Sequence, residues 1–270
     1  MVRRVAAHVF LEDVEVPALN LAEADFHHLS RVLRLRPGEA VSASDGAGRL
    51  LACRWTGARA LEPAGQISYQ DRPWPPVTVA FALTKGEHPE WAVQKLTEAG
   101  VDRVIVMTTA RCIARWGAAD SPRRLARLKE VARQAAMQSR RVWLPSIDGP
   151  FTFSQVVSAP QLVSTGGVVT AGEPSDVQAG ASVQAGAAPA GVALAVPDGS
   201  PLSLATPTVL VGPEGGWSDE ELGAVVHHVA LGPHVLRAET AALAAGVLLA
   251  ALRSHLVAEV PQVPATRSCR

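Results

Sequence analysis

The chain has 270 residues, 48% of them apolar, which is enough to bury one or two hydrophobic cores. Its 25 basic and 25 acidic side chains balance, and no apolar run approaches the roughly 20 residues of a membrane span, which argues against a membrane protein. Three scattered cysteines, Cys53, Cys112 and Cys269, suggest no disulfide framework and no metal pair, so a reduced cytoplasm is the simplest location.

The charges are unevenly distributed along the chain. Residues 85–141 carry twelve basic and six acidic side chains, whereas residues 1–84 are balanced and residues 142–270 are acidic. The basic segment indicates either a surface that binds a polyanion or the solvated face of a helix.

Residues 1 to about 72 have the pattern of a small β-rich domain. We expect strands at residues 7–10, 39–44 and 49–55, with a turn at 45–48 joining the last two. A small barrel built from such hairpins fits this spacing.

A short basic helix is expected at residues 25–36, ended by Pro37 and Gly38. Its apolar residues share one face: Phe26, Leu29, Val32 and Leu33. Its arginines form one cluster that contacts phosphates or only solvates the surface: Arg31, Arg34 and Arg36.

The proline-rich residues 71–76 mark a domain boundary, after which strands and helices alternate. This alternation predicts an α/β domain with a parallel sheet. The expected elements are a strand at 77–83, a helix at 90–99 that packs through Trp91, Val93 and Leu96 and ends at Gly100, a strand at 104–107, and an arginine-rich helix at 122–140.

Residues 165–191 are built from small and polar residues and are predicted to be a flexible insertion. A short strand at 192–196 follows. The last element expected is an alanine- and leucine-rich helix at about 240–257.

The most informative stretch is residues 208–222, in which a strand ends at a glycine-rich loop and a helix begins. Ser218 is a good N-cap, and Glu221 three residues later completes a capping box. Glycines let a ligand approach the backbone, but the loop has no lysine, and Glu214 would repel a phosphate. A neutral or cationic ligand with a flat ring fits better; the alternative is a sharp turn without a ligand.

Arg237 is the first lysine or arginine after Arg141. It stands beside a Glu-Thr pair in the turn before the last helix. It is either paired with Glu239 or Glu214, or placed for function.

Five segments of the chain form a recognisable series: residues 28–34 with Gly38, 94–101, 134–140, 212–216 and 231–241. In this order they resemble the ribosomal RNA small subunit methyltransferase E (RsmE) family. Members of this family transfer a methyl group to N3 of a uridine in 16S ribosomal RNA. Ala99 departs from the family pattern in a way that should change packing only. Gln134 and Met137 stand where the family commonly has an acidic residue, which argues against a carboxylate role on the helix at 122–140.

The resemblance implies an α/β protein with two domains: a PUA-like β-barrel at residues 1–72 and a SPOUT-type domain at residues 77–260 that ends in a trefoil knot. It also implies a homodimer formed through the C-terminal domain. The partner would be 16S ribosomal RNA or the small ribosomal subunit.

The cofactor implied is S-adenosylmethionine, whose flat adenine and sulfonium suit a glycine loop with a carboxylate. Leu231 and Leu236 would sandwich the adenine, or else belong to the ordinary core. The expected binding residues are Leu194, Gly212, Glu214, Gly215, Gly216, Leu231, Gly232, Leu236, Thr240 and Ala241.

Methylation of uracil N3 requires loss of its proton. Arg237 is expected to stabilise the negative charge that develops on the uracil oxygens, and Glu239 is a weaker candidate for the general base. No cluster has the spacing of metal ligands, and the adjacent histidine pairs at 27–28 and 227–228 are expected to be surface or packing residues.

Basic residues of both domains are expected to contact the RNA backbone: Arg31, Arg34, Arg111, Arg115, Arg140 and Arg141. Two other functions fit the same residues. One is an RNA-binding assembly factor without methyl transfer, and the other is a methyltransferase for a different RNA site.

Overall fold

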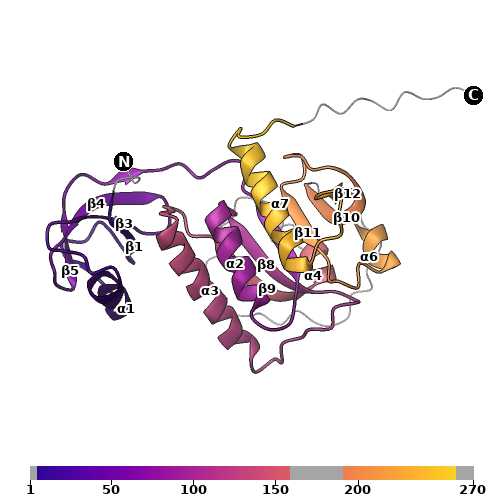
Figure 1. The fold of residues 1–270 in the computed structure, drawn as a ribbon, viewed down its shortest axis with the longest axis horizontal. Coiled ribbons are helices and arrows are strands. Elements are labelled where there is room, and N and C mark those ends of the chain that lie inside the picture. The colour runs from indigo at the N-terminus through magenta and orange to yellow at the C-terminus, as the bar shows by residue number, and fades with distance from the viewer. Residues whose placement is uncertain (1–4, 159–190, 260–270) are drawn as a thin grey trace, which may run out of the picture.

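The computed structural model describes residues 5–158 and 191–259. The N-terminal part is one six-stranded sheet with two short helical turns (Figure 1). Its strands follow the order β1-β3-β4-β5-β2, with β6 paired to β4, and only β1 and β3 run parallel. The elements are β1 (Ala7–Phe10), β2 (Leu19–Asn20), α1 (Glu23–His27), the π-helix η2 (His28–Val32), β3 (Ala40–Ser44), β4 (Arg49–Trp55), β5 (Ala60–Pro63) and β6 (Ser68–Tyr69).

The C-terminal part is a six-stranded, wholly parallel sheet with the order β12-β10-β11-β7-β8-β9. The α/β class predicted from the sequence is therefore confirmed. Its elements are β7 (Thr78–Ala82), α2 (His88–Ala99), β8 (Arg103–Thr108), α3 (Ser121–Gln138), β9 (Ser146–Thr152), α4 (Phe153–Ser158), β10 (Val192–Pro201), β11 (Thr208–Val211), α6 (Asp219–Ala224), β12 (His227–Ala230) and α7 (Ala238–Arg253).

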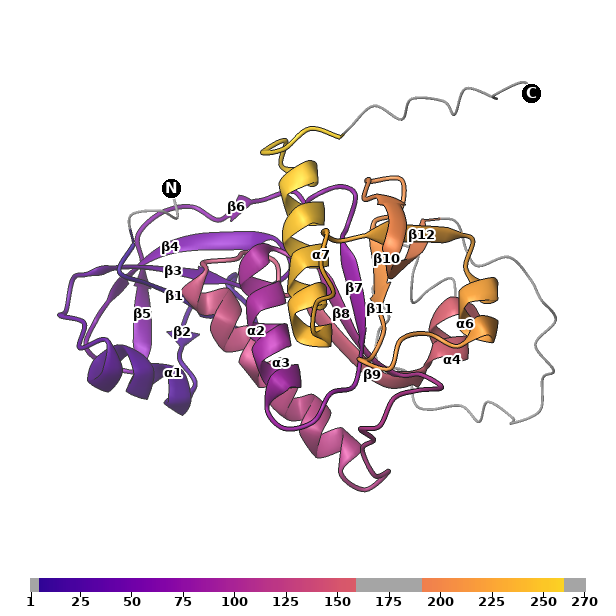
Figure 2. The same cartoon turned by 45° about the vertical axis from the view of Figure 1, so that its right-hand side comes forward.

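The parallel sheet has a hydrophobic core on each face because side chains alternate along a strand. On β7, Val79 and Phe81 belong to the core beneath α2, α3 and α7, whereas Ala80 points into the opposite core with Phe153 and Trp217. Figure 2 shows α2 lying between α3 and α7 on one face of the sheet. This arrangement leaves the carboxyl ends of the strands open to form a site.

The helix predicted at residues 25–36 is shorter than expected. It begins at Glu23 and ends at Val32, and its second half is the π-helix η2, in which the Leu33 N–H bonds to the His28 carbonyl at 2.9 Å. The wider π-turn rotates the following residues around the axis. As a result Leu29 is buried, but Val32 is 60% exposed and does not join the packed face.

Other boundaries differ by a few residues. The helix predicted at 90–99 begins at His88 and ends, as predicted, with Gly100 in a left-handed conformation. Val93 and Leu96 of this helix are buried, but Trp91 is 41% exposed, so its predicted packing role is wrong. The strand predicted at 192–196 extends to Pro201, and the last helix ends at Arg253. The predicted insertion at 165–191 lies, except for Gly191, outside the described residues.

An ion pair joins α3 to α1 of the N-terminal part. Arg133 donates to both carboxylate oxygens of the buried Asp25, at 3.0 and 2.5 Å, and to the carbonyl of Phe10 at 3.2 Å. Ala136 and Met137 of α3 belong to the N-terminal core. The hydrogen bond that Arg133 donates to Asp25 raises the pKa of Arg133 against the effect of burial, so the guanidinium stays charged.

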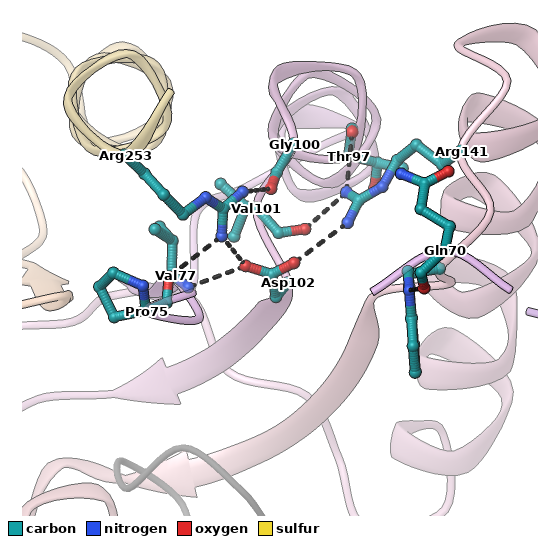
Figure 3. A network of polar contacts seen from close by, with 10 residues as sticks. Gln70, Pro75, Val77, Thr97, Gly100, Val101, Asp102, Arg141 and Arg253 are labelled. Carbon is teal, nitrogen blue, oxygen red and sulfur yellow. Dashed lines mark hydrogen bonds and ion pairs between the residues drawn. The ribbon is translucent and has the colours of Figure 1, made fainter. Parts of the chain in front are cut away.

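A second buried network ties the linker, α2 and α7 together around Asp102, which is 3% exposed (Figure 3). Its carboxylate accepts from the Val77 N–H at 2.8 Å, from Arg253, and from Arg141 at 3.5 Å. Arg253 also donates to the carbonyls of Pro75 and Gly100, and Arg141 donates to those of Thr97 and Val101. Two guanidinium groups therefore share one carboxylate inside the fold.

Helices in the described ranges are all too short or too polar to cross a membrane. The same residues contain no group of three histidine, cysteine or acidic side chains placed to hold a metal ion.

The buried His8 should make stability depend on pH. Burial lowers its pKa to about 4, the Arg140 charge lowers it too, and the Arg141 backbone acts in the opposite direction. The unfolded chain therefore binds the proton first, below pH 6.5, and stability falls as the pH drops from 6.5 towards 4. We expect a loss of about 3 kcal/mol over this window, measured by urea unfolding.

His8→Asn should flatten this dependence, because an amide can still bond Ser42, which lies 2.8 Å from His8 Nδ1. His28→Gln, a change at an exposed histidine, is the matched control and should leave the pH profile unchanged. The same slope in His8→Asn and the wild type would contradict the assignment.

Candidate cofactor site

The loop between β11 and α6 is held by the predicted capping box, which is confirmed. The Ser218 hydroxyl accepts from the Glu221 N–H at 3.2 Å, and the Glu221 carboxylate accepts from the Ser218 N–H at 2.9 Å. The second oxygen of Glu221 accepts from the Ala110 N–H at 2.8 Å, which joins this loop to the loop after β8. One buried carboxylate thus fixes two loops at the same edge of the sheet.

Gly212 directly follows β11 and lies against the ring of Trp217. A Cβ at this position would lie 2.9 Å from the ring of Trp217, closer than side chains pack. The Trp217 ring is fixed in turn, because its Nε1 donates to the Ala195 carbonyl at 3.0 Å and it packs against Phe153. The glycine is therefore required by a close approach, and the loop has one well-defined shape.

A cavity of about 390 Å³ opens beside this loop, within the range of small-molecule sites. Three segments form it: the middle of β10, the glycine loop, and the turn between β12 and α7. Its walls are mostly apolar side chains and bare backbone, and its charged side chains are Glu214 and Arg237. No lysine lines it, so a phosphate has few partners here apart from Arg237.

The structure brings most of the predicted cofactor residues together at this cavity. Those that line it are Gly212, Glu214, Gly216, Leu231, Gly232, Leu236 and Ala241. Leu194 does not line it, because it points from β10 into the core on the opposite face of the sheet. Gly215 lies against Arg111, and Thr240 is exposed on the first turn of α7.

The sequence interpretation missed one wall of the cavity. Residues 195–197 of β10 line it, one position beyond the predicted Leu194. The alternation of side chains along a strand was the available signal, because it places Leu194 and Ala195 on opposite faces. Further lining residues that were not predicted are Val211, Pro213, Trp217, His234, Val235 and Ala238.

Arg237 lines the cavity at the N-terminus of α7, and its side chain is exposed. Within residues 5–158 and 191–259 it makes no ion pair with Glu239 or Glu214, so of the two alternatives the structural pairing is not found. Glu239 instead lies 3.1 Å from the Nδ1 of His88, at the start of α2. The two helix starts hold the carboxylate away from Arg237, which leaves the guanidinium available to a ligand.

The arginines predicted to bind RNA lie in different surroundings. Arg31, Arg34, Arg111 and Arg115 are exposed, and Arg140 is half-buried. Arg111 also donates to the Gly215 carbonyl at 3.2 Å, so it abuts the glycine loop. Arg141 is the exception. It is bound in the Asp102 network, and burial lowers its pKa to about 10, so the structure places it in the interior and not on an RNA-accessible surface.

Comparison with family models identifies the class. A model described as an RNA methyltransferase domain matches residues 72–250, and one described as an RNA methyltransferase PUA domain matches residues 21–58. The parallel sheet with its terminal cavity is therefore an RNA methyltransferase domain, and the N-terminal sheet is a PUA domain.

Among known proteins, the chain is 38% identical over 234 residues to ribosomal RNA small subunit methyltransferase E of Mycobacterium tuberculosis, covering 81% of this chain and 80% of that protein. It is 30% identical to the Synechocystis protein of the same name, over 85% and 72% of the two chains. The chain belongs to the ribosomal RNA small subunit methyltransferase E family.

Solved structures share the fold. The Neisseria gonorrhoeae ribosomal RNA small subunit methyltransferase E bound to S-adenosyl methionine aligns with a TM-score of 0.67 at 24% identity, over 92% of this chain and 97% of that chain. A putative methyltransferase from Legionella pneumophila, also in complex with this cofactor, aligns with the same TM-score at 22% identity, over 92% and 98% of the two chains.

Proposed function

We propose that this protein uses S-adenosylmethionine to methylate N3 of a uridine in 16S ribosomal RNA. The observation that carries the proposal is the cavity at the glycine loop, which combines apolar walls and bare backbone with a carboxylate and without a lysine. Family membership supports the same activity, because the relatives carry the name of a small subunit ribosomal RNA methyltransferase.

The residues of the cavity fit this cofactor. Leu231 and Leu236 offer apolar surfaces for an adenine ring, and Gly212, Gly216 and Gly232 leave the backbone groups open to its polar edge. The Glu214 carboxylate suits a cationic sulfur. When bound, the cofactor supplies a methyl group on a sulfonium, which a nucleophile attacks in line.

The uracil N3 proton must leave before or during attack, and negative charge then develops on the neighbouring oxygens. Arg237 is placed to stabilise this charge, since its guanidinium lines the cavity without a protein partner in the described structure. Glu239 is the candidate base; its contact with His88 would orient it and offer the proton a path towards solvent.

The RNA is proposed to lie across both domains, taken as residues 1–72 and 77–260. Exposed Arg31, Arg34, Arg111 and Arg115 would contact phosphates, together with Arg140. We also propose a homodimer formed through the C-terminal domain, a cytoplasmic location beside the ribosomal substrate, and the trefoil knot that the family resemblance implies.

The cofactor site can be tested with two glycine variants. Gly212→Ala should weaken S-adenosylmethionine binding about tenfold or more, because the new Cβ meets the Trp217 ring and displaces the loop. Gly223→Ala in α6, where a Cβ meets nothing within 4 Å, is the control and should bind as the wild type does. Calorimetry gives the affinities.

Methylation of small-subunit RNA, followed by mass mapping of the modified nucleotide, tests the reaction itself. A well-folded wild-type protein that binds no S-adenosylmethionine would overturn the proposal. Binding of cofactor and RNA without any methyl transfer would favour an assembly factor instead.

A further inference from the structure

A second, larger hollow lies away from the cofactor cavity, in the groove between α2 and α3. It has a volume of about 800 Å³. We call it the α2–α3 groove and define it by the side chains that the argument uses: Trp91, Gln94, Arg127, Gln134 and Gln138. We propose that this groove binds an unpaired stretch of the RNA substrate, with one base stacked on Trp91; the proposal rests on the proposed function.

The first support is the chemistry of its polar groups. Gln94 and Gln138 make no side-chain hydrogen bond within the described part of the chain, so their amides offer free donors and acceptors. The Gln134 amide N–H donates a hydrogen bond to the Glu130 carboxylate at 2.8 Å. Amide groups beside an exposed aromatic ring are the combination that recognises bases splayed out of a single strand.

The second support is Trp91. Its ring is 41% exposed, although the neighbouring residues of α2, Ala92 and Val93, are fully buried. Burial of a large ring is favourable, so an aromatic face left open on a rigid helix is available to a partner. Because α2 packs against both α3 and α7, the backbone that carries this ring is held in place.

The third support is the charge of the two walls. The α3 side has one charged lining residue, Arg127, which is exposed and makes no ion pair in the described structure. The α2 side carries Glu87 and Glu90, and the buried Oε2 of Glu90 has no hydrogen-bond partner. A single strand has an anionic backbone on one side and neutral bases on the other, so its phosphates would follow α3 and its bases would face α2.

This polarity favours RNA over a second copy of the chain as the occupant. The centre of a protein–protein interface is depleted of charged residues, whereas seven of the ten residues that line this groove are glutamates, glutamines, an arginine and a histidine.

One residue of the α2–α3 groove contacts α7, the helix whose start borders the cofactor cavity. His88 lines the groove, and its Nδ1 contacts Glu239, two residues from Arg237 in the cavity wall. In Figure 2 the start of α7 lies next to α2 on the same face of the sheet. A strand lying in the groove would therefore place a neighbouring nucleotide towards the cavity, so the base on Trp91 would flank the methylated uridine.

The test uses the full chain and a fluorescently labelled, uridine-rich single-stranded RNA, titrated at several salt concentrations. Trp91→Ala should weaken binding by about 5- to 150-fold, as expected for loss of one stacked base, and Trp91→Phe should keep most of the affinity. The salt dependence should not change in either variant. Trp74→Ala removes another exposed tryptophan, 73% exposed in the linker and outside the groove, and should bind as the wild type does.

Arg127→Ala should behave differently, with weaker binding and a salt slope reduced by about one, because it removes a phosphate contact. Affinity for S-adenosylmethionine should be unchanged in all these variants, which separates the groove from the cofactor site.

Unchanged RNA affinity in Trp91→Ala, with cofactor binding and methylation intact, overturns the groove proposal and leaves the proposed function standing. A change in the sedimentation of Trp91→Ala also overturns it, because the face would then be a contact between copies of the chain. Loss of cofactor binding in the wild type would instead remove the proposed function.

Discussion

Replacing Arg237 with alanine is expected to slow methyl transfer by about 100- to 1,000-fold while leaving affinity for S-adenosylmethionine nearly unchanged. The side chain lines the cavity, carries the positive charge that the uracil oxygens would need, and has no carboxylate partner in the described structure. Its contribution should appear in the transition state, so kcat should fall more than KM rises. Single-turnover transfer of a labelled methyl group measures the rate.

Two further variants separate three contributions to the rate: the charge of Arg237, the geometry of its guanidinium, and proton transfer to Glu239. Arg237→Lys keeps the charge but loses the planar fork, so it should recover part of the rate. Glu239→Gln tests the base: a large fall in rate that becomes smaller at high pH would support it, because more of the uridine is then ionised. A rate in Arg237→Ala equal to that of the wild type would show that the guanidinium has no catalytic role.

The sequence predicts local structure well where a side chain interacts with residues close to it in the chain. Ser218 and Glu221 predict a capping box from their spacing alone, and Gly100 predicts the end of α2. The β11 strand and the loop that follows it were also predictable, because four β-favouring residues end at a glycine. These features depend on contacts within a few residues, and the structure confirms them.

Features that depend on contacts between residues far apart in the chain are harder to predict from the sequence. The π-turn of η2 and the exposed ring of Trp91 have no signature in hydrophobic periodicity, because packing decides which residues of a face are covered. Arg141 resembles any arginine of a basic segment, yet it meets Asp102 and α2 carbonyls in the interior. For the β10 wall of the cavity, the strand was predicted but the residue was wrong: Leu194 faces the opposite core, and residues 195–197 line the cavity.

Asp102→Ala is expected to lower the free energy of unfolding by about 3–5 kcal/mol, the usual effect of removing one partner of a buried ion pair. Arg141 and Arg253 would then remain in the interior without a counter-charge, and the Val77 N–H would lose its acceptor. The Asp102 charge raises the pKa of Arg141 against the effect of burial, so its removal should lower that pKa further. Urea unfolding followed by circular dichroism measures the change.

Asp102→Asn separates the loss of charge from the loss of the hydrogen bond, because an amide oxygen can still accept from the Val77 N–H but carries no charge. The free energy of unfolding of Asp102→Asn should lie between that of the wild type and that of Asp102→Ala. The control is Asp148→Ala, which breaks the 2.8 Å pair with Arg103; Asp148 is 31% exposed, so a loss of about 1 kcal/mol or less is expected. If Asp102→Ala were no more destabilising than Asp148→Ala, the backbone carbonyls around the two arginines would suffice to hold the linker, α2 and α7 together. The carboxylate would then not be the centre of the network.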